Sequence, residues 1–440
     1  MNSLAKENAT LTMPTGALRR LFAAVIVPAR RVGFVLLAVA PGSAGRLIAQ
    51  ASPNGALPQP RAVVGPVAVS RGVLRTVSGL RELTGARVLV NDFGSRRLVI
   101  LDSALTKYVV VLDSALGPER SYGARNGGLI PFGVDTTLFY DAASRTLLPI
   151  LPDGSIGSAI ALPFQGHAAA FVAGGYVRAD GQNLIYVAPP GRPAVSVSAG
   201  GSAPAALNDS SPLVRANLLT RVVDTLGFLR TPRREQDLPY TPPDGAKGVM
   251  RAVRDPVLVT DGWAMTSDGS IGIVRGGDYH VDWIRGGRLI SSPRMDYPWH
   301  RLSDEDKRAL VDSGRAFVGA HPTKYVATLN GREDDGFVVD SVVGAAELPD
   351  YIGPFASPPL ADADGHIWVL PVTTIAPIFV PPAAASRAPA TYDVVDSNGR
   401  IVKRVTIPAG TSIAGFGKGT IYLVEREGPG VSLARFRIPQ

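Results

Sequence analysis

Residues 87–102 read Arg-Val-Leu-Val-Asn-Asp-Phe-Gly-Ser-Arg-Arg-Leu-Val-Ile-Leu-Asp, which is two short apolar strands around a Gly-containing turn. The unit returns along the chain, often with an Asp-Gly turn just before an aromatic or aliphatic strand. Copies follow at 137–151, 180–187, 268–274 and 364–369, and the last pair of strands is 392–396 and 420–424. Short strands that return every few tens of residues are typical of radial or stacked β architectures. The repeat therefore predicts a scaffold, although no residue set in it specifies a reaction.

The composition supports a β core. Gly (48) and Pro (37) are abundant among the 440 residues, and charged residues make up only 19%. Such a composition suits many tight turns between half-buried strands better than it suits helices. Long helical periodicity is nearly absent after about residue 60. Repeat architectures run longer than average domains, so one unit can account for this length.

The N-terminal 51 residues have the features of an export signal. Arg30 and Arg31 precede an uncharged apolar stretch, 32–40, and Ala49-Gln50-Ala51 fits a signal-peptidase site. We expect a signal peptide over 1–51, general secretion, and a periplasmic or secreted mature protein. An uncleaved membrane anchor is the alternative, although the apolar stretch is short for a transmembrane helix. A polar, Pro-rich spacer over 52–62 is expected to be disordered.

The positive charge is concentrated in this segment. The formal net charge is +8, and residues 1–51 contribute six basic residues and one acidic residue to it. A nucleic-acid binder usually concentrates charge on one face of its folded domain. The pattern therefore argues against a nucleic-acid partner. The chain has no cysteine, which excludes disulfides, thiolate catalysis and Cys-ligated zinc.

Several stretches resemble bacterial exported six-bladed β-propellers of the TolB-like kind. The matching stretches are 85–98, 135–141, 221–226, 263–269, 279–284 and 360–369. The resemblance implies an all-β fold over 63–440, a six-bladed β-propeller of four-stranded antiparallel blades. It also implies an exported location, but it carries no catalytic residues, because the shared motifs are structural. WD and kelch signatures are missing, which argues against those propeller classes.

Two features of the arrangement can be predicted. The strand near Arg435 is expected to pair into one blade with a strand within 64–77, because closure of the ring removes an exposed sheet edge. An insertion over about 293–349 is expected to hold one short helix near 303–314. Ser303 caps it, three acidic residues complement its dipole, and Gly314 suits its end. We expect this helix to cover one face of the disc. Thr231 to Lys247 is interpreted as a loop or a hairpin excursion.

The densest polar and aromatic cluster lies just before that helix. It comprises Asp296, Tyr297, Trp299, His300 and Arg301. Tyr and Trp offer a stacking surface, and His and Arg offer donors, a combination common at binding surfaces. We treat these five residues as the candidate ligand-binding site. The alternative is a packed anchor that holds the insertion onto the disc, since Tyr and Trp usually serve packing.

Other chemistry finds little support. The five histidines are scattered and no H-E-x-x-H occurs, so a zincin site is not expected. Asp362-Ala363-Asp364-Gly365 has too few oxygen ligands for calcium, and Asp-Gly is favoured in hairpin turns in which both central residues take positive φ. Neither a phosphate-binding loop nor a nucleophile elbow appears. No catalytic residue, metal or cofactor is therefore predicted.

These patterns favour a binding module of the cell envelope. A propeller holds many loops on one rigid face, which suits recognition of a protein or a small ligand. The rival interpretation is a lactonase-like hydrolase or lyase with its site at the central channel. Carboxylates and imidazoles from at least three blades would have to meet there. A monomer without a stable membrane span after signal cleavage is expected.

Overall fold

The computed structural model describes residues 57–440 with internal gaps. The gaps are 118–119, 125, 142–143, 163–177, 189–208, 233–234, 240–249, 256, 258, 321–322, 330–331, 356, 373–387 and 429. All of the described residues belong to the unit Ser52–Gln440. The predicted signal peptide, residues 1–51, lies outside them, as does most of the predicted spacer. Pro60–Ala62, at the end of that spacer, forms a strand, β1.

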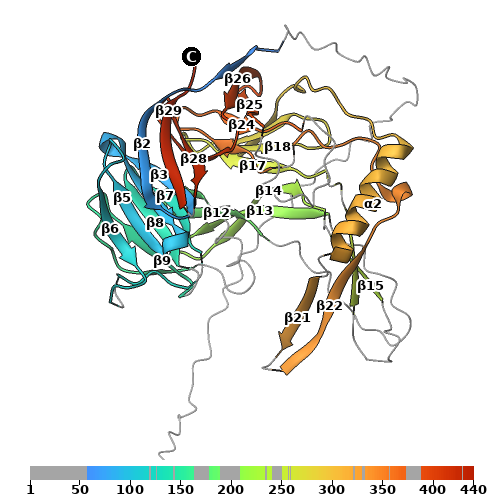
Figure 1. Ribbon diagram of the computed structural model, residues 1–440, viewed down its shortest axis with the longest axis horizontal. Coiled ribbons are helices and arrows are strands. Elements are labelled where there is room, and N and C mark those ends of the chain that lie inside the picture. The colour runs from blue at the N-terminus through green and yellow to red at the C-terminus, as the bar shows by residue number, and fades with distance from the viewer. Residues whose placement is uncertain are drawn as a thin grey trace, which may run out of the picture. The chain divides into compact units, whose positions relative to one another are not determined.

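Six four-stranded antiparallel sheets form the blades of a propeller, as the sequence predicts (Figure 1). Blade 1 consists of β3 (Val77–Leu83), β4 (Arg87–Asp92), β5 (Arg97–Leu101) and β6 (Tyr108–Asp113). Blade 2 consists of β7 (Gly128–Phe132), β8 (Thr136–Asp141), β9 (Thr146–Ile150) and β10 (Ile160–Ala161). Blade 3 consists of β11 (Arg178–Asp180), β12 (Asn183–Val187), β13 (Ser210–Asn217) and β14 (Val223–Arg230). Blade 4 consists of β17 (Gly262–Met265), β18 (Ile271–Val274), β19 (Val281–Arg285) and β20 (Arg288–Ser291). Blade 5 consists of β23 (Leu360–Ala361), β24 (Ile367–Val369), β25 (Ala390–Val395) and β26 (Ile401–Ile407). Blade 6 consists of β27 (Thr411–Gly417), β28 (Thr420–Glu427), β29 (Gly430–Arg437) and β2 (Val64–Leu74).

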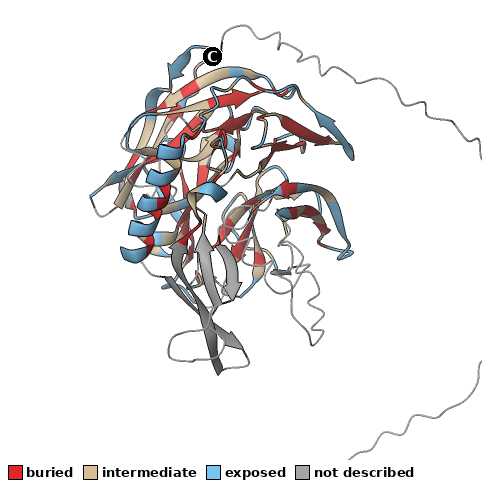
Figure 2. Cartoon of the chain, turned by 90° about the vertical axis from the view of Figure 1, so that its right-hand side faces the viewer, coloured by how far each residue is buried: buried red, intermediate tan, exposed pale blue. Residues whose placement is uncertain are grey.

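The core lies between neighbouring blades. A strand in the middle of a blade is covered on both faces, so it consists of consecutive apolar residues, as in β18 and β24. Strands at the outer edge are exposed, as in β20. Six hydrophobic clusters join successive blades around the ring, the last of them joining blade 6 to blade 1. The buried residues concentrate within the blades in Figure 2.

The predicted closure of the ring is confirmed. β2 pairs antiparallel with β29, with Ala68 opposite Arg435 and Ser70 opposite Leu433. The N-terminal part of the unit thereby supplies the outermost strand of the last blade, which removes an open edge. β1 adds a parallel strand to the outer edge of β26 in blade 5. The chain thus joins two neighbouring blades before blade 1 begins.

A seventh sheet lies outside the blades. It consists of β15 (Glu235–Pro239), β16 (Met250–Arg254), β22 (Arg332–Val342) and β21 (Thr323–Leu329), in that order. Because β16 pairs in parallel with β22, the hairpin expected after Thr231 and the insertion between blades 4 and 5 form one substructure. The sequence patterns did not predict this pairing between two distant segments. The insertion also holds α2 (Asp304–Ala320) and a 3-10 turn, η4 (Ala345–Glu347).

The start of α2 is as predicted, but its end and its packing differ. Ser303 Oγ accepts a hydrogen bond from Asp306 N at 3.1 Å, and Asp306 Oδ2 accepts one from Ser303 N at 2.9 Å. The helix continues past Gly314, which is buried on its packed face, and ends at Ala320. The buried Leu310 and Val311 pack against residues of the insertion and one residue before blade 4, namely Leu302, Val343, Leu348 and Val257. The prediction that the helix covers a face of the disc is therefore wrong.

The Asp-Gly turns are structural, but the turn type differs from the expected one. Gly269 has φ +81°, whereas no described Asp has positive φ. Gly269 N donates to Thr266 O at 3.0 Å, and Asp268 Oδ1 accepts from Ser270 N at 3.0 Å. This is a turn with one left-handed residue after two ordinary ones, and the carboxylate holds its far side. Asp153-Gly154 repeats the arrangement in blade 2.

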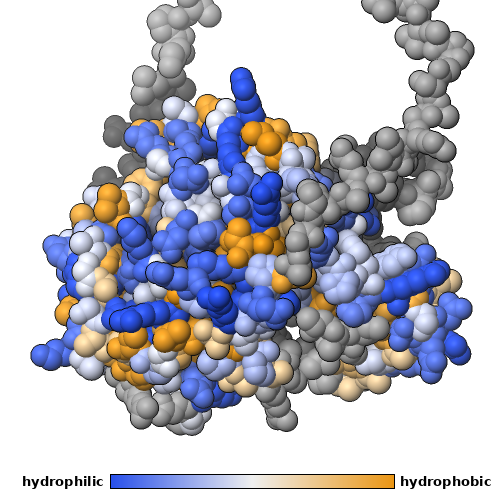
Figure 3. Space-filling view, turned by 90° about the horizontal axis from the view of Figure 1, so that it is seen from above, coloured by the Kyte–Doolittle hydropathy of each residue, from blue (hydrophilic) through white to orange (hydrophobic). Residues whose placement is uncertain are grey.

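On the face that Figure 3 shows, hydrophobic side chains gather in small patches among hydrophilic ones. Scattered apolar residues of this kind are ordinary for a surface in contact with water. No helix among the described residues is long and apolar enough to cross a membrane.

Candidate functional site

The predicted cluster lies in the stem through which the chain leaves blade 4 and enters the insertion. Met295 N donates to Tyr279 O at 2.7 Å, which attaches this stem to the β18–β19 turn. Further along, Leu302 N donates to Asp350 O at 2.8 Å and Ile352 N donates to His300 O at 3.2 Å. The outgoing and returning segments therefore run side by side. The position of the cluster is set by both of them.

Four aromatic rings form a ladder from the core to the surface. Tyr279 and Tyr297 have ring centroids 5.6 Å apart, Tyr297 and Trp299 are 5.3 Å apart, and Trp299 and Tyr351 are 6.5 Å apart, all in edge-to-face geometry. Exposure rises along the ladder: Tyr279 is fully buried, Trp299 is 37% exposed and Tyr351 is 46% exposed. Edge-to-face packing stabilises aromatic pairs beyond the area they bury. The outer two rings are therefore held in place while they remain accessible.

The inner end of the ladder is fixed by buried polar contacts. Tyr279 Oη donates to Asp393 Oδ2 at 3.1 Å, and Arg404 Nε contacts Asp393 Oδ1 at 3.2 Å. Burial raises the pKa of Asp393, and the hydrogen bonds and charge of Tyr279 and Arg404 oppose this effect. Burial, together with the nearby Asp393, raises the pKa of Tyr279 well above its ordinary value. Tyr279 therefore stays a neutral donor.

Of the five predicted residues, three meet at one place. Tyr297 is partly buried, donates from Oη to Val372 O at 2.6 Å, and contacts both Trp299 and His300. The Asp296 and Arg301 side chains are exposed, and Arg301 forms an isolated β-bridge with Tyr351. Asp296 lies in the same stem, but no contact places it against the rings. Tyr297 is thus a partly buried anchor, whereas Asp296, Trp299 and Arg301 are exposed.

Tyr351 was not among the predicted site residues. It follows the cluster by about fifty residues and lies after η4, so local spacing gave no signal for it. Only the pairing of the returning segment with residues 300–302 brings its ring against Trp299. We call Trp299 and Tyr351, with Tyr297 behind them and His300 beside them, the aromatic platform.

The charges next to the platform are mixed. Lys307 Nζ contacts Asp350 Oδ1 at 2.8 Å, and this contact lowers the pKa of the Asp350 carboxyl, with a further contribution from the Arg301 charge. Asp350 is exposed, so the pair is worth little to stability. Both signs of charge therefore lie next to the rings, and Lys307 and Asp350 are already paired with each other.

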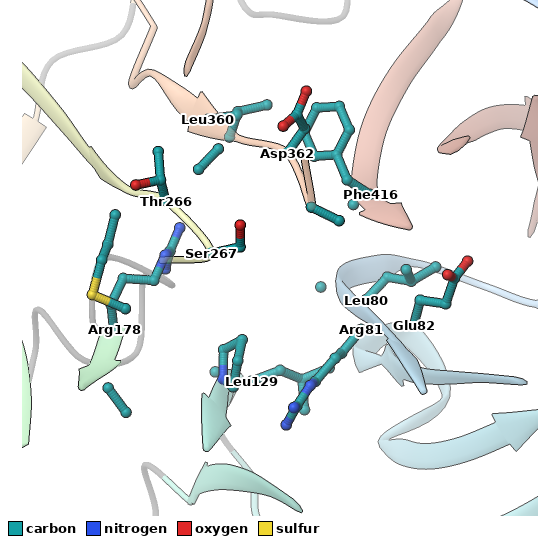
Figure 4. Close-up of a pocket in the computed structure, with 18 of the residues that line it drawn as sticks. Leu80, Arg81, Glu82, Leu129, Arg178, Thr266, Ser267, Leu360, Asp362 and Phe416 are labelled. Carbon is teal, nitrogen blue, oxygen red and sulfur yellow. The ribbon is translucent and has the colours of Figure 1, made fainter. Parts of the chain in front are cut away.

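A hollow lies at the centre of the ring of blades. It has a volume of about 870 Å³, and the first strand of every blade lines it, from β3 through β27. Figure 4 shows these side chains converging on one space from several blades. Two Asp-Gly turns, Asp180-Gly181 after β11 and Asp268-Gly269 after β17, lie at one mouth of this channel. Asp362 and Ala363, after β23, line it as well.

The carboxylates of this channel are mostly engaged within the protein. Glu82 Oε2 accepts a hydrogen bond from Tyr422 Oη at 2.5 Å, and Asp362 Oδ2 accepts from Trp368 Nε1 at 2.9 Å. Asp268 accepts from Thr266 Oγ1 at 2.6 Å. Across the part of the chain that the structure describes, no three metal-ligating side chains form a cluster. His366 Nδ1 lies 3.1 Å from Asp362 Oδ2.

Platform and channel mouth are on opposite faces of the disc. The Asp268-Gly269 turn precedes β18, and the turn that holds Tyr279 follows β18. The two ends of one strand lie on opposite faces of a blade. The protein therefore presents two separate places where another molecule could bind.

No protein-family model matches the chain, and no curated protein matches it. Solved structures with a similar course include a member of the DUF4221 family from Bacteroides vulgatus, 11% identical, with 86% of this chain and 96% of that one covered and a TM-score of 0.41. A gluconolactonase from Xanthomonas campestris is 11% identical over 86% and 87% of the two chains, with a TM-score of 0.34. A virginiamycin B lyase from Staphylococcus aureus is 12% identical over 84% and 83%, with a TM-score of 0.33. At these values none of the three informs on activity, and the propeller assignment rests on the strand pairing above.

Proposed function

We propose that this protein is an exported binding module of the cell envelope that recognises a partner through the aromatic platform. The observation that carries the proposal is the pair Trp299 and Tyr351, two large rings that contact each other edge to face and remain 37% and 46% exposed. Rigid, accessible Trp and Tyr side chains lose little conformational entropy on binding, and they dominate many interfaces. His300 and Arg301 add donors at the edge. Asp296, in the same stem, supplies an acceptor.

The export part of the proposal rests on the N-terminal segment. Arg30 and Arg31, the apolar stretch 32–40 and the Ala49-Gln50-Ala51 site support a signal peptide. The TolB-like resemblance supports the same location. N-terminal sequencing of the protein from the periplasm or medium should find Ser52 first. Recovery of the protein in the membrane fraction with residues 1–51 intact would favour the uncleaved anchor.

Photo-cross-linking tests recognition in the native compartment. A benzoylphenylalanine residue placed at Trp299 or at Tyr351 should give a discrete adduct under ultraviolet light. The control position is Leu219, which is 70% exposed in the β13–β14 turn on the opposite face. A purified partner should then lose affinity for the Trp299→Ala variant by about tenfold or more, as expected for an aromatic hot spot. Adducts of equal yield at all three positions, or unchanged affinity in the variant, would contradict the proposal.

The channel carries the alternative, a lactonase-like hydrolase or lyase. Four blades bring carboxylates to its lining, from Glu82, Asp180, Asp268 and Asp362. Three of them are already engaged with neighbouring groups, and for this reason binding at the platform is favoured. Hydrolysis of simple lactones that is lost in an Asp180→Asn variant would favour the alternative.

A further inference from the structure

The aromatic platform and the residue beside it carry donors that make no hydrogen bond within the described part of the chain. These are Trp299 Nε1, Tyr351 Oη and the Arg301 guanidinium, and all three side chains are exposed. Tyr297 Oη differs, because it donates to Val372 O at 2.6 Å. An indole N–H and a guanidinium can only donate, and a phenol can donate as well. The platform therefore offers a ligand several donors next to apolar rings.

The acceptors near the rings are fewer, and they are engaged or lie elsewhere. Asp350 Oδ1 is 2.8 Å from Lys307 Nζ. Asp296 belongs to the same stem, but no contact places it against the rings. A sugar, whose hydroxyls both donate and accept, would leave donors of its own without a partner on this surface. The excess of donors therefore favours a ligand whose polar groups are acceptors.

The two outer rings form a corner and not a flat surface. Trp299 and Tyr351 stand at 87° to each other with ring centroids 6.5 Å apart, and Tyr297 meets Trp299 at 89°. A flat ligand ring could stack on only one of two perpendicular rings. A compact apolar group can contact both of them. The pyrrolidine ring of proline is such a group, and grooves lined by aromatic residues are the common receptors of proline-rich segments.

The charges at the platform favour an uncharged ligand. Lys307 and Asp350 are paired with each other, and Arg301 and Asp296 add one charge of each sign in the same stem. An ammonium ligand would gain from the ring faces but would meet the Arg301 charge. An anionic ligand would meet the charges of Asp350 and Asp296. A neutral segment meets neither penalty.

A proline-rich segment satisfies all three conditions. Proline has a backbone carbonyl but no N–H, so a run of prolines offers acceptors and no backbone donors. In the polyproline II conformation the backbone makes no internal hydrogen bonds, which leaves its carbonyls open to a receptor. The fixed φ of proline also reduces the conformational entropy that is lost on binding.

We propose, building on the proposed function, that the partner of the aromatic platform presents a proline-rich segment in the polyproline II conformation. A proline ring of that segment occupies the corner between Trp299 and Tyr351. Carbonyls of the segment accept hydrogen bonds from Trp299 Nε1, Tyr351 Oη and the Arg301 guanidinium. Binding of this kind makes and breaks no covalent bond.

Titration calorimetry of the purified protein with acetylated and amidated octaproline measures this binding. The peptide is uncharged, and its prolines have no N–H. It should bind saturably at millimolar concentration and about tenfold or more tightly than a capped Gly-Ser octapeptide. The control peptide has the same number of backbone carbonyls, but it lacks the apolar rings and the fixed backbone.

Two variants separate the hydroxyl of the platform from its rings. Tyr351→Phe keeps the ring and removes Oη, so octaproline should bind several-fold more weakly, as the loss of one hydrogen bond implies. Trp299→Ala removes one wall of the corner and should weaken binding by about tenfold or more. Tyr108→Phe makes the matched change at a tyrosine that is 42% exposed on the outer strand β6, and it should leave the affinity unchanged. Native melting curves for all three variants exclude unfolding as the cause.

Equal affinities for octaproline and the Gly-Ser peptide would overturn the proposal, and so would absence of octaproline binding at millimolar concentration. Tighter binding of chitotriose or of tetramethylammonium would also overturn it, because a glycan or a cation would then be the preferred ligand. Photo-cross-linking at Trp299 and Tyr351 detects a partner of any class. Adducts there without octaproline binding would remove only the proline-rich partner, whereas absence of adducts would remove the proposed function itself.

Discussion

At the scale of single residues, exposure separates side chains that stabilise the fold from those that remain available for binding. Trp368 is fully buried and donates to Asp362, whereas Trp299 is 37% exposed at the outer end of the ladder. The sequence shows two similar Trp residues, each close to a short strand or turn. Only burial distinguishes their roles.

Trp299→Ala should therefore cost much less stability than the roughly 3–5 kcal/mol typical of a core aromatic truncation. Trp368→Ala is the matched control and should reach that range, because it leaves a cavity and removes one hydrogen bond to the buried Asp362 carboxylate. Urea unfolding of both variants measures the difference. If Trp299→Ala proves as costly as Trp368→Ala, Trp299 is an anchor rather than part of a recognition surface.

Acid sensitivity at the residue scale should be visible at Asp282. Burial raises the pKa of its carboxyl, but hydrogen bonds from Ser291 and Arg275 and the positive charge nearby outweigh burial, so the net shift is downward. Arg275 Nε lies 2.7 Å from Asp282 Oδ2. Because the folded pKa lies below the unfolded value of about 3.9, the stabilisation is complete above that pH and is lost as the pH falls through the folded pKa.

The variant Asp282→Asn should be less stable than the native protein at pH 7, and the gap should narrow below about pH 4. Urea midpoints at pH 7, 5, 4 and 3 measure it. Asp224→Asn breaks an exposed pair with Arg215 and should show almost no gap at any pH. A gap for Asp282→Asn that stays constant down to pH 3 would show that the carboxylate charge is not the stabilising feature.

At the scale of elements, a local sequence signal sets the start of α2, and tertiary contacts account for where it packs. Ser303 and Asp306 exchange hydrogen bonds at the N-terminus, which the sequence predicts. The predicted C-terminal end of the helix was wrong because Gly314 lies on the packed face of α2. There the absence of a side chain serves packing and does not end the helix. The apolar residues of α2, Leu310 and Val311, pack against Leu302, Val343 and Leu348.

Ser303→Ala should destabilise the helix by about 1 kcal/mol, since one side-chain acceptor for the first turn is lost. Ser303→Thr keeps the hydroxyl and should be close to the native protein. Hydrogen exchange of the amides at 305–308 reports the change locally, even if the melting temperature of the propeller does not move. Equal exchange in the Ala and Thr variants would mean that the cap contributes nothing.

At the scale of the whole molecule, the ring closes through its N-terminal strand. β2 completes blade 6, and Leu74 at its end is buried in the cluster that joins blade 6 to blade 1. The opposite side of the same strand is open, since Val67 is 44% exposed. Closure of the ring by β2 therefore depends on a few buried side chains together with the backbone pairing of β2 with β29.

Leu74→Ala should cost about 2–5 kcal/mol, because it leaves a cavity at the closing contact. Val67→Ala, in the same strand, should cost well under 1 kcal/mol, as exposed substitutions do. Chemical unfolding followed by tryptophan fluorescence compares the two. Similar costs for both variants would show that closure does not depend on packing at Leu74.

The sequence by itself determined the class of fold. Apolar runs of four to six residues between Asp-Gly turns specify strands and hairpins, because strand and turn preferences act over a few neighbouring residues. Strands at both ends of the unit also predicted closure, and pairing of Ala68 with Arg435 confirms it. The Ser303 cap and the cluster from Asp296 to Arg301 were likewise readable as local patterns.

Only the tertiary structure decided which distant segments meet. It joined Tyr351 to Trp299, paired β16 with β22, and brought Arg178 to a cavity lined by six blades. These contacts depend on the chain path between segments far apart in sequence, and no local periodicity records that path. The propeller could therefore be predicted from its repeat, whereas the two candidate binding sites could be built only from its folded geometry.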